Sequence, residues 1–132
     1  MLSKNMKSDR TIEDILKSTS SVLFPEEFGN RKVELDTRDC DGDTPLHVMA
    51  GQNDRVAVEM LIEAGADINA LGDMGETPLH VATRKETLLS MEALLFSGAK
   101  TNIKNEFGEN VQEAVKRKGG KIEKIFRKYR RN

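Results

Sequence analysis

The chain has 132 residues, of which 37% are hydrophobic and 33% are charged, and its formal net charge is −1. This length predicts one domain, and no stretch reaches the roughly 18–20 apolar residues that a membrane span needs. The single cysteine, Cys40, excludes an internal disulfide, and residues 1–10 lack the apolar run of a secretory signal, so a soluble, cytoplasmic protein is predicted.

Charge is unevenly divided along the chain. Residues 116–132 carry nine Lys or Arg side chains against one acidic residue, Glu123. The residues before them carry 12 basic and 21 acidic side chains, a balance of −9. An acidic body followed by a basic segment is therefore the electrostatic feature that a function has to explain.

The first 38 residues contain helical patterns but no repeated motif. Residues 9–17 are expected to form a helix, because their apolar side chains recur at i, i+3 and i+4. The polar run 18–21 is expected to interrupt this helix. Residues 22–24 then provide an apolar anchor, and Pro25 to Phe28 suit one more helical turn. We interpret residues 1–38 as a divergent N-terminal cap.

Two later segments repeat each other at a spacing of 33 residues. Residues 42–49 read GDTPLHVM, and residues 75–82 read GETPLHVA. The segment AGADIN at 64–69 returns as SGAKTN at 97–102, in the same register. In both TPLH copies the threonine can cap a helix and the proline suits the position after the cap, so each copy predicts a helix start.

A period of 33 with the motif TPLHVA resembles the ankyrin repeat. The resemblance covers about residues 39–118 and implies an all-α fold, namely an ankyrin-repeat solenoid of helix-turn-helix units with finger loops. One repeat would span 39–71 and a second 72–104. Residues 105–132 would form a degenerate repeat and a C-terminal capping helix, so that residues 1–132 make a single domain.

Each unit is expected to contain an inner and an outer helix. In the first repeat these would span about 44–51 and 55–64, and the second repeat should copy both. The resemblance implies that the loops 66–75 and 99–108 project as two-stranded fingers. In the third unit the sequence NVQE at 110–113 stands where TPLH would be, which leaves the start of that inner helix less defined.

The only histidines, His47 and His80, lie one period apart. As members of the repeated motif they are expected to hydrogen-bond between neighbouring units rather than act as catalytic bases or metal ligands. No partner residues complete a zinc site, and no nucleophile or phosphate-loop motif occurs. Neither catalysis, nor a metal, nor another cofactor is predicted.

The resemblance implies a partner-binding site on the concave face that finger tips and inner helices form. Six of the nine fingertip residues carried over are acidic, and Met74 and Phe107 add apolar side chains. This combination predicts a groove for a basic protein, in which charge speeds encounter and apolar anchors provide affinity. Alternatively, the acidic loops serve only solubility. The predicted partner-binding residues are Asp41, Asp43, Gln52, Asp73, Met74, Glu76, Arg84, Lys85, Glu106, Phe107 and Glu109.

The most specific function we predict is that of a cytosolic immunity protein that neutralises a cognate bacterial toxin with a basic cleft. The chain resembles the compact, free-standing ankyrin proteins of bacteria, some of which have this role. One alternative is a viral or host-directed ankyrin inhibitor of a transcription factor or signalling protein. Another is nucleic-acid binding through the basic C-terminal helix. The free protein is expected to be a monomer that does not bind membranes.

Overall fold

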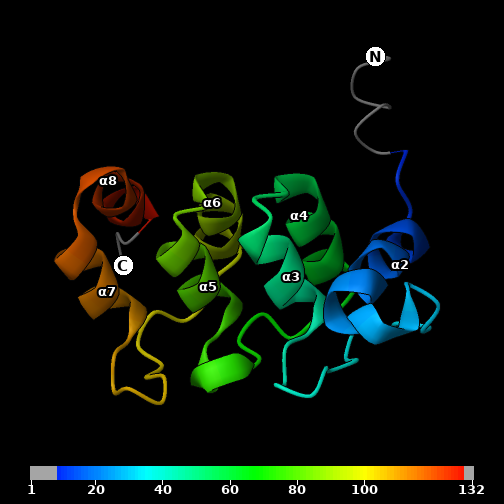
Figure 1. Ribbon diagram of the computed structural model, residues 1–132. Coiled ribbons are helices and arrows are strands. Elements are labelled where there is room, and N and C mark those ends of the chain that lie inside the picture. The colour runs from blue at the N-terminus through cyan, green and yellow to red at the C-terminus, as the bar shows by residue number, and fades with distance from the viewer. Residues whose placement is uncertain (1–8, 130–132) are drawn as a thin grey trace.

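The chain forms a row of helical pairs that stack side by side in chain order, as the computed structural model in Figure 1 shows. The structure describes residues 9–129, so the outermost parts of both predicted caps, 1–8 and 130–132, lie outside the described residues. The inner helices are α3 (Pro45–Gly51), α5 (Pro78–Lys85) and α7 (Val111–Lys118). The outer helices are α4 (Arg55–Glu63), α6 (Leu88–Phe96) and α8 (Gly120–Tyr129). Within 9–129 no strand forms, and the predicted all-α class is confirmed.

The core is a thin apolar layer that runs the length of the stack. Leu46 and Leu79 are equivalent residues of two successive inner helices, and both are fully buried. Leu61 and Leu94 hold the same relation in the outer helices. Each inner helix contacts the next inner helix and each outer helix the next outer one. Neighbouring units therefore cover each other's apolar faces, and α8 closes the layer with the buried Ile122.

The inner helices begin at reciprocal capping hydrogen bonds. Thr44 and Thr77 form capping boxes, as their motif predicts. In the third unit Asn110 takes this role: its side chain accepts a hydrogen bond from the Glu113 backbone N–H, and the Glu113 carboxylate accepts one from the Asn110 N–H, both at 2.9 Å. The changed sequence there preserves the helix start, because asparagine is as good a cap as threonine.

The N-terminal helix α2 spans Ile12–Leu23 and is longer than the sequence predicted. The expected break at residues 18–21 was wrong. The Ser18 and Thr19 hydroxyls donate to carbonyls one turn earlier, Thr19 Oγ1 to Leu16 O at 2.7 Å. Ser20 Oγ donates to Arg31 O at 2.9 Å, so these groups are satisfied without ending the helix. Thr11 caps α2 and precedes Thr44 by one period, so α2 takes the place of an inner helix.

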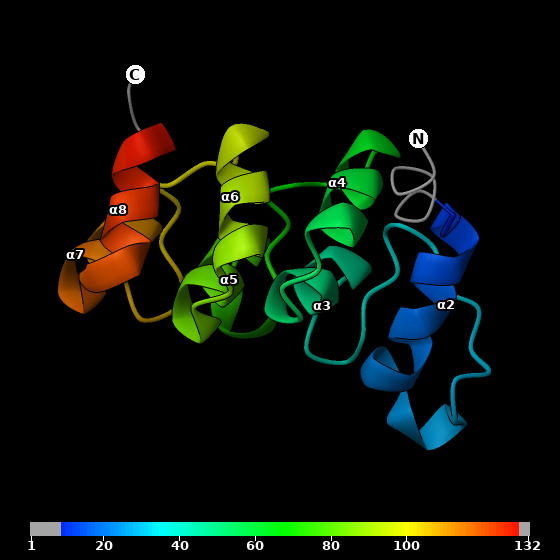
Figure 2. The same ribbon diagram turned by 90° about the horizontal axis from the view of Figure 1, so that it is seen from above.

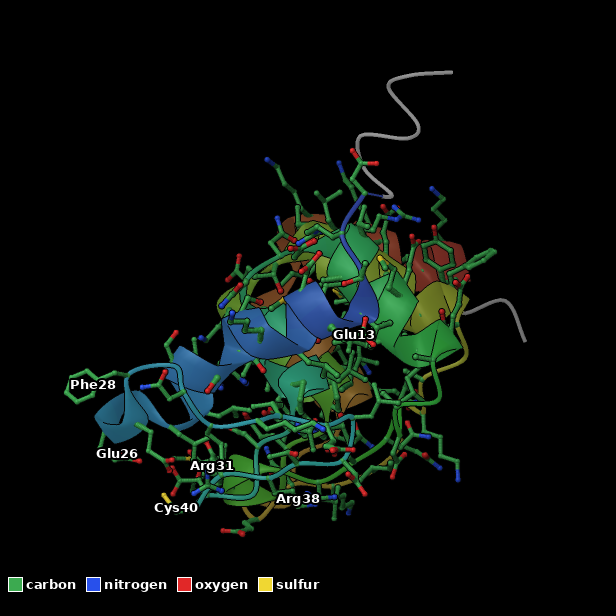
Figure 3. All side chains as sticks on the ribbon, turned by 90° about the vertical axis from the view of Figure 1, so that its right-hand side faces the viewer. Glu13, Glu26, Phe28, Arg31, Arg38 and Cys40 are labelled. Carbon is green, nitrogen blue, oxygen red and sulfur yellow. The ribbon has the colours of Figure 1, made fainter. Side chains whose placement is uncertain are left out.

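No outer helix accompanies α2. It is followed by one 3-10 turn, η1 (Pro25–Glu27), and by an irregular segment that leads to the first finger. Figure 2 shows α2 at one end of the row beside α3, which it contacts. Figure 3 looks at this end, where Phe28 points away from the body and is 86% exposed. The N-terminal region thus forms half of a unit.

The finger loops lie on one side of the stack, below the helices in Figure 1. The expected two-stranded fingers were wrong, because no loop within 9–129 contains a strand. Each loop is closed instead by a few turn hydrogen bonds, of which one joins its first and last residues, and these do not form a ladder. We define the first, second and third fingers by these bonds, from Asp39 N to Asp43 O (3.0 Å), from Gly72 N to Glu76 O (2.7 Å) and from Asn105 N to Glu109 O (3.0 Å).

Candidate partner-binding site

The two histidines connect each inner helix to the next finger. Nδ1 of His47 accepts a hydrogen bond from the Thr44 backbone N–H at 3.1 Å, so Nε2 carries the ring proton and donates to Glu76 O at 2.9 Å. His80 repeats this arrangement and donates to Glu109 O at 3.1 Å. Burial lowers the pKa of His47, which favours this neutral form. The predicted role of both histidines in bonding between units is confirmed.

A hollow of about 190 Å³ lies between α3, α5 and the first two fingers. Its apolar lining comes from Val22 of α2, Val48 of α3 and Val81 of α5. The structure brings six of the predicted binding residues together around it. These six are Asp43, Gln52, Asp73, Glu76, Arg84 and Lys85.

Acidic residues of the second and third fingers are neutralised within the chain. Glu76 is buried, and its carboxylate binds Arg84 of α5, with Nη2 2.9 Å from Oε1. Glu109 binds Arg117 of α7 through two contacts of 2.9 and 3.0 Å, which lower the pKa of the Glu109 carboxyl. Both acids were predicted to face a partner. The structure has each one paired, which reduces the negative charge that these fingers present.

The first finger keeps its negative charge. Asp41 is exposed, and the neighbouring carboxylates of Asp73, Asp39 and Asp43 raise its pKa, with Asp73 having the largest effect. Among the ion pairs of the described chain, none includes any of these four residues. The acidic charge of this face that no ion pair neutralises is therefore concentrated where the first and second fingers meet. A nearby cation is Arg84, whose pKa is raised most by its own ion-pair partner and further by Asp43 and Asp73.

Asp43 also holds the first two fingers together. Its Oδ1 accepts a hydrogen bond from the Asp73 backbone N–H at 2.9 Å. Beside it, Arg38 Nη1 donates to Gly42 O and Leu71 O at 2.8 and 2.7 Å, one carbonyl from each side of the junction. In Figure 3 Arg38 lies on the finger side of the molecule, and the exposed Cys40 lies at its edge. The charged surface is thus built on a fixed backbone.

Two apolar side chains project from the second and third fingers. Met74 is 48% exposed and Phe107 is 75% exposed. Met74 has a left-handed backbone, with φ at 59°, which disfavours any residue with a side chain, and its carbonyl accepts a hydrogen bond from Glu106 N at 3.0 Å. The predicted residues that lie outside the lining of the hollow are Asp41, Met74, Glu106, Phe107 and Glu109.

Sequence reasoning missed two members of this site. Val22 was expected to be part of an apolar anchor, and it is instead 52% exposed and lines the hollow. Asp39 was not among the predicted residues, although its carboxylate adds to the charge around Asp41. A comparison of equivalent positions would have found Asp39, because Gly72 and Asn105 stand there in the next two fingers and carry no charge.

A family model described as ankyrin repeats in three copies matches residues 12–105, which is more than half of the chain. The chain belongs to the ankyrin-repeat family. The match begins at the first residue of α2, in agreement with the place of that helix as the first inner helix of the ankyrin stack. Ankyrin repeats generally mediate protein–protein interaction, and proteins built from them are typically interaction modules rather than enzymes.

In this ankyrin stack, intramolecular pairing also reduces the basic charge at the C-terminal end. Of the seven Lys and Arg side chains on α7 and α8, four form ion pairs. The pairs are Arg117–Glu109, Lys118–Glu86, Arg127–Glu123 and Lys128–Glu92. Among the described residues, no helix is long and apolar enough to cross a membrane.

Proposed function

We propose that this ankyrin-repeat protein binds a basic segment of a protein partner through the hollow and the finger tips beside it. The observation that carries the proposal is the group of carboxylates around Asp41 that form no ion pair, which adjoins a hollow lined in part by three valines. A cationic partner would relieve the repulsion among these carboxylates, and their field would speed its approach. An acidic surface that served only solubility would have no need of an adjoining hollow with valines in its lining.

The remaining predicted residues have separate roles in this proposal. Met74 and Phe107 supply exposed apolar area, from which most of the affinity of an interface comes. The Glu76–Arg84 pair forms one wall of the hollow and contributes shape rather than net charge. Gln52, Lys85, Glu106 and Glu109 extend the contact surface around this centre.

The specific role we propose is that of a cytoplasmic immunity protein, monomeric until it binds, that blocks a toxin with a basic active-site cleft. The negative face around Asp41 supports this role. A basic segment of a transcription factor or signalling protein would suit the same surface, as in a viral or host-directed inhibitor. The identity of the captured partner separates these roles.

The test is affinity capture from the organism that carries the gene. Mass spectrometry identifies the captured proteins, and binding is then measured with the purified partner. The bait variant replaces Asp41, Asp43 and Asp73 with asparagine, which keeps the hydrogen-bond acceptor on residue 43. The matched control makes three neutral replacements at exposed acids elsewhere, namely Glu26→Gln, Glu63→Gln and Asp67→Asn.

We expect a directly binding basic protein that the wild-type and control baits capture and the variant loses. Its association rate should fall steeply between about 50 and about 500 mM NaCl, because screening weakens the attraction between exposed charges. A partner that binds all three baits alike, or whose binding is indifferent to salt, would contradict the proposal. Retention on heparin that disappears when Lys121, Lys124 and Lys128 are replaced would instead favour the nucleic-acid alternative.

A further inference from the structure

The three units differ at one equivalent position next to the hollow. Helices α5 and α7 carry Arg84 and Arg117 there, 33 residues apart, and each arginine holds the acid of its own finger through two nitrogens. The equivalent residue of α3 is Gly51, and the equivalent acid is Asp43. The first unit therefore has the acid of this pair without its arginine.

The space that this arginine would occupy is part of the hollow. Gly51 and Asp43 both line it, and the valines of α2, α3 and α5 provide its apolar lining. The Lys85 side chain lies across Gly51, since a Cβ built on Gly51 would be 3.1 Å from Lys85 Nζ and 3.3 Å from Cδ. Within residues 9–129 the Lys85 side chain takes part in none of the ion pairs, and its ammonium group has no hydrogen bond, so no such bond has to break for it to move aside.

We propose that the hollow receives an arginine side chain of the partner, in the place that Arg84 and Arg117 fill in their own units. This inference rests on the proposed function and names the group that the partner inserts. The guanidinium binds Asp43 as Arg84 binds Glu76, while its methylene stem lies against the valines. Asp43 and Asp73 line the hollow without an ion-pair partner of their own, because Arg84 in the same lining is paired with Glu76.

Arginine fits this site better than lysine for a geometric reason. Two ion pairs within the chain, Glu76–Arg84 and Glu109–Arg117, serve as templates for the proposed contact. In both, two guanidinium nitrogens of the arginine face one carboxylate, an arrangement we call the fork. An ammonium group is a single point of charge and cannot form these two parallel bonds. The fork therefore predicts a preference among cationic side chains, which charge alone does not.

The probe for this proposal is N-acetyl-arginine methylamide, titrated into the 15N-labelled full chain and followed by amide chemical shifts. N-acetyl-citrulline methylamide has nearly the same shape without the charge, and the ionic strength is held equal with NaCl. We expect saturable shifts centred on Gly51, Gln52 and Asp73. The citrulline derivative should bind at least about tenfold more weakly, since it lacks the charge-assisted bonds.

Three variants sharpen the test. Gly51→Arg supplies the arginine from within the chain and should abolish the saturable shifts. Gly51→Ala adds one methyl group, which only the mobile end of Lys85 has to avoid, and should retain binding. Lys85→Ala opens the hollow and removes a competing cation, so it should bind the arginine derivative several-fold more tightly. A variant that gains affinity cannot be explained by unfolding.

The proposal is overturned if arginine and citrulline derivatives bind equally, if the shifts spread over all acidic loops, or if Gly51→Arg responds like the wild type. Its failure is distinct from failure of the proposed function. The small probe reports on the hollow alone, whereas capture of the protein partner by Gly51→Arg reports on docking. The hollow could bind the arginine derivative while the Gly51→Arg variant captures the partner as well as the wild type does. That pair of results would support the arginine site and contradict its use in partner binding.

Discussion

The first finger and the two that follow it have the same backbone closure but different electrostatics. In the second and third fingers the acid at the end of the loop is held by an arginine of the next helix, at Arg84 and Arg117. In the first finger the equivalent acid, Asp43, has Gly51 opposite it. Internal pairing makes an acidic fingertip a structural element, and its absence leaves charge and space for a partner.

The fingers also differ in how their turns are held. The side chain of Asp39 closes the first finger by accepting two backbone hydrogen bonds, and Asn105 does the same in the third. The second finger has Gly72 at this position, and its turn is held by Asp43 of the first finger. A side chain of the first finger therefore holds the turn of the second, whereas the turn of the third is held by its own Asn105 and joins the second finger through a backbone hydrogen bond.

The largest expected effect tests this coupling. A Cβ on Gly72 would overlap Asp43 Oδ1 and crowd His47 Nε2, both of which bond to the second finger. We expect Gly72→Ala to lower the free energy of unfolding by about 2–3 kcal/mol, through overpacking and lost hydrogen bonds. The contrasting variant is Gly51→Ala, which should gain up to about 1 kcal/mol because alanine favours helix. Urea unfolding measures both, and equal stability of the two variants would refute the coupling.

A smaller effect should distinguish the two paired fingers. The Glu76 side chain is 10% exposed and that of Glu109 is 30% exposed, so removal of the arginine leaves a more poorly solvated carboxylate at Glu76. We expect Arg84→Ala to cost about 1–2 kcal/mol and Arg117→Ala less than about 0.5 kcal/mol, since both arginines are largely in solvent. Thermal unfolding of the two variants measures the difference. The reverse order would show that burial of the acid does not set how much each ion pair contributes to the free energy of unfolding.

Much of the fold follows from local chemistry that the sequence displays. The 33-residue period, the capping threonines and the glycines after the helices placed α3 to α6 to within about one residue of their observed ends. Helix α2 was misjudged because a run of hydroxyl side chains is typical of a helix end. Thr19 and Ser20 are instead fully buried in α2, which packs against α3, and this tertiary contact is invisible to a local pattern.

The candidate site was harder to predict, because charge alone does not show which acids are free. Glu76 and Arg84 are eight residues apart, one in a finger and one near the end of a helix, so no local helical rule pairs them. Alignment of the units would have suggested the pair, since Glu109 and Arg117 repeat it. The hollow itself depends on the contact of α2 with α3, which places Val22 in the same lining as Gly51, and no periodicity encodes that contact.

The smallest effect concerns the mutual repulsion at the first fingertip. Because neighbouring carboxylates raise the pKa of Asp41 in the folded chain, the folded state disfavours its charged form relative to the unfolded state. The destabilisation is absent at a pH where Asp41 is protonated in both states, and it sets in as the pH rises through the acidic range. At neutral pH it is fully present.

Asp41→Asn should therefore raise the melting temperature slightly at pH 7, while Glu63→Gln, a control at another exposed acid, should not. The gain should shrink in about 1 M NaCl, which screens exposed charges, and should vanish as the pH falls below about 3.9, the usual pKa of aspartate. The same variant should slow association with a basic partner. If Asp41→Asn gains stability and associates more slowly, the charges of the first finger are retained for function at a cost to the fold. If it does not gain stability, the carboxylates do not repel one another appreciably in the folded protein.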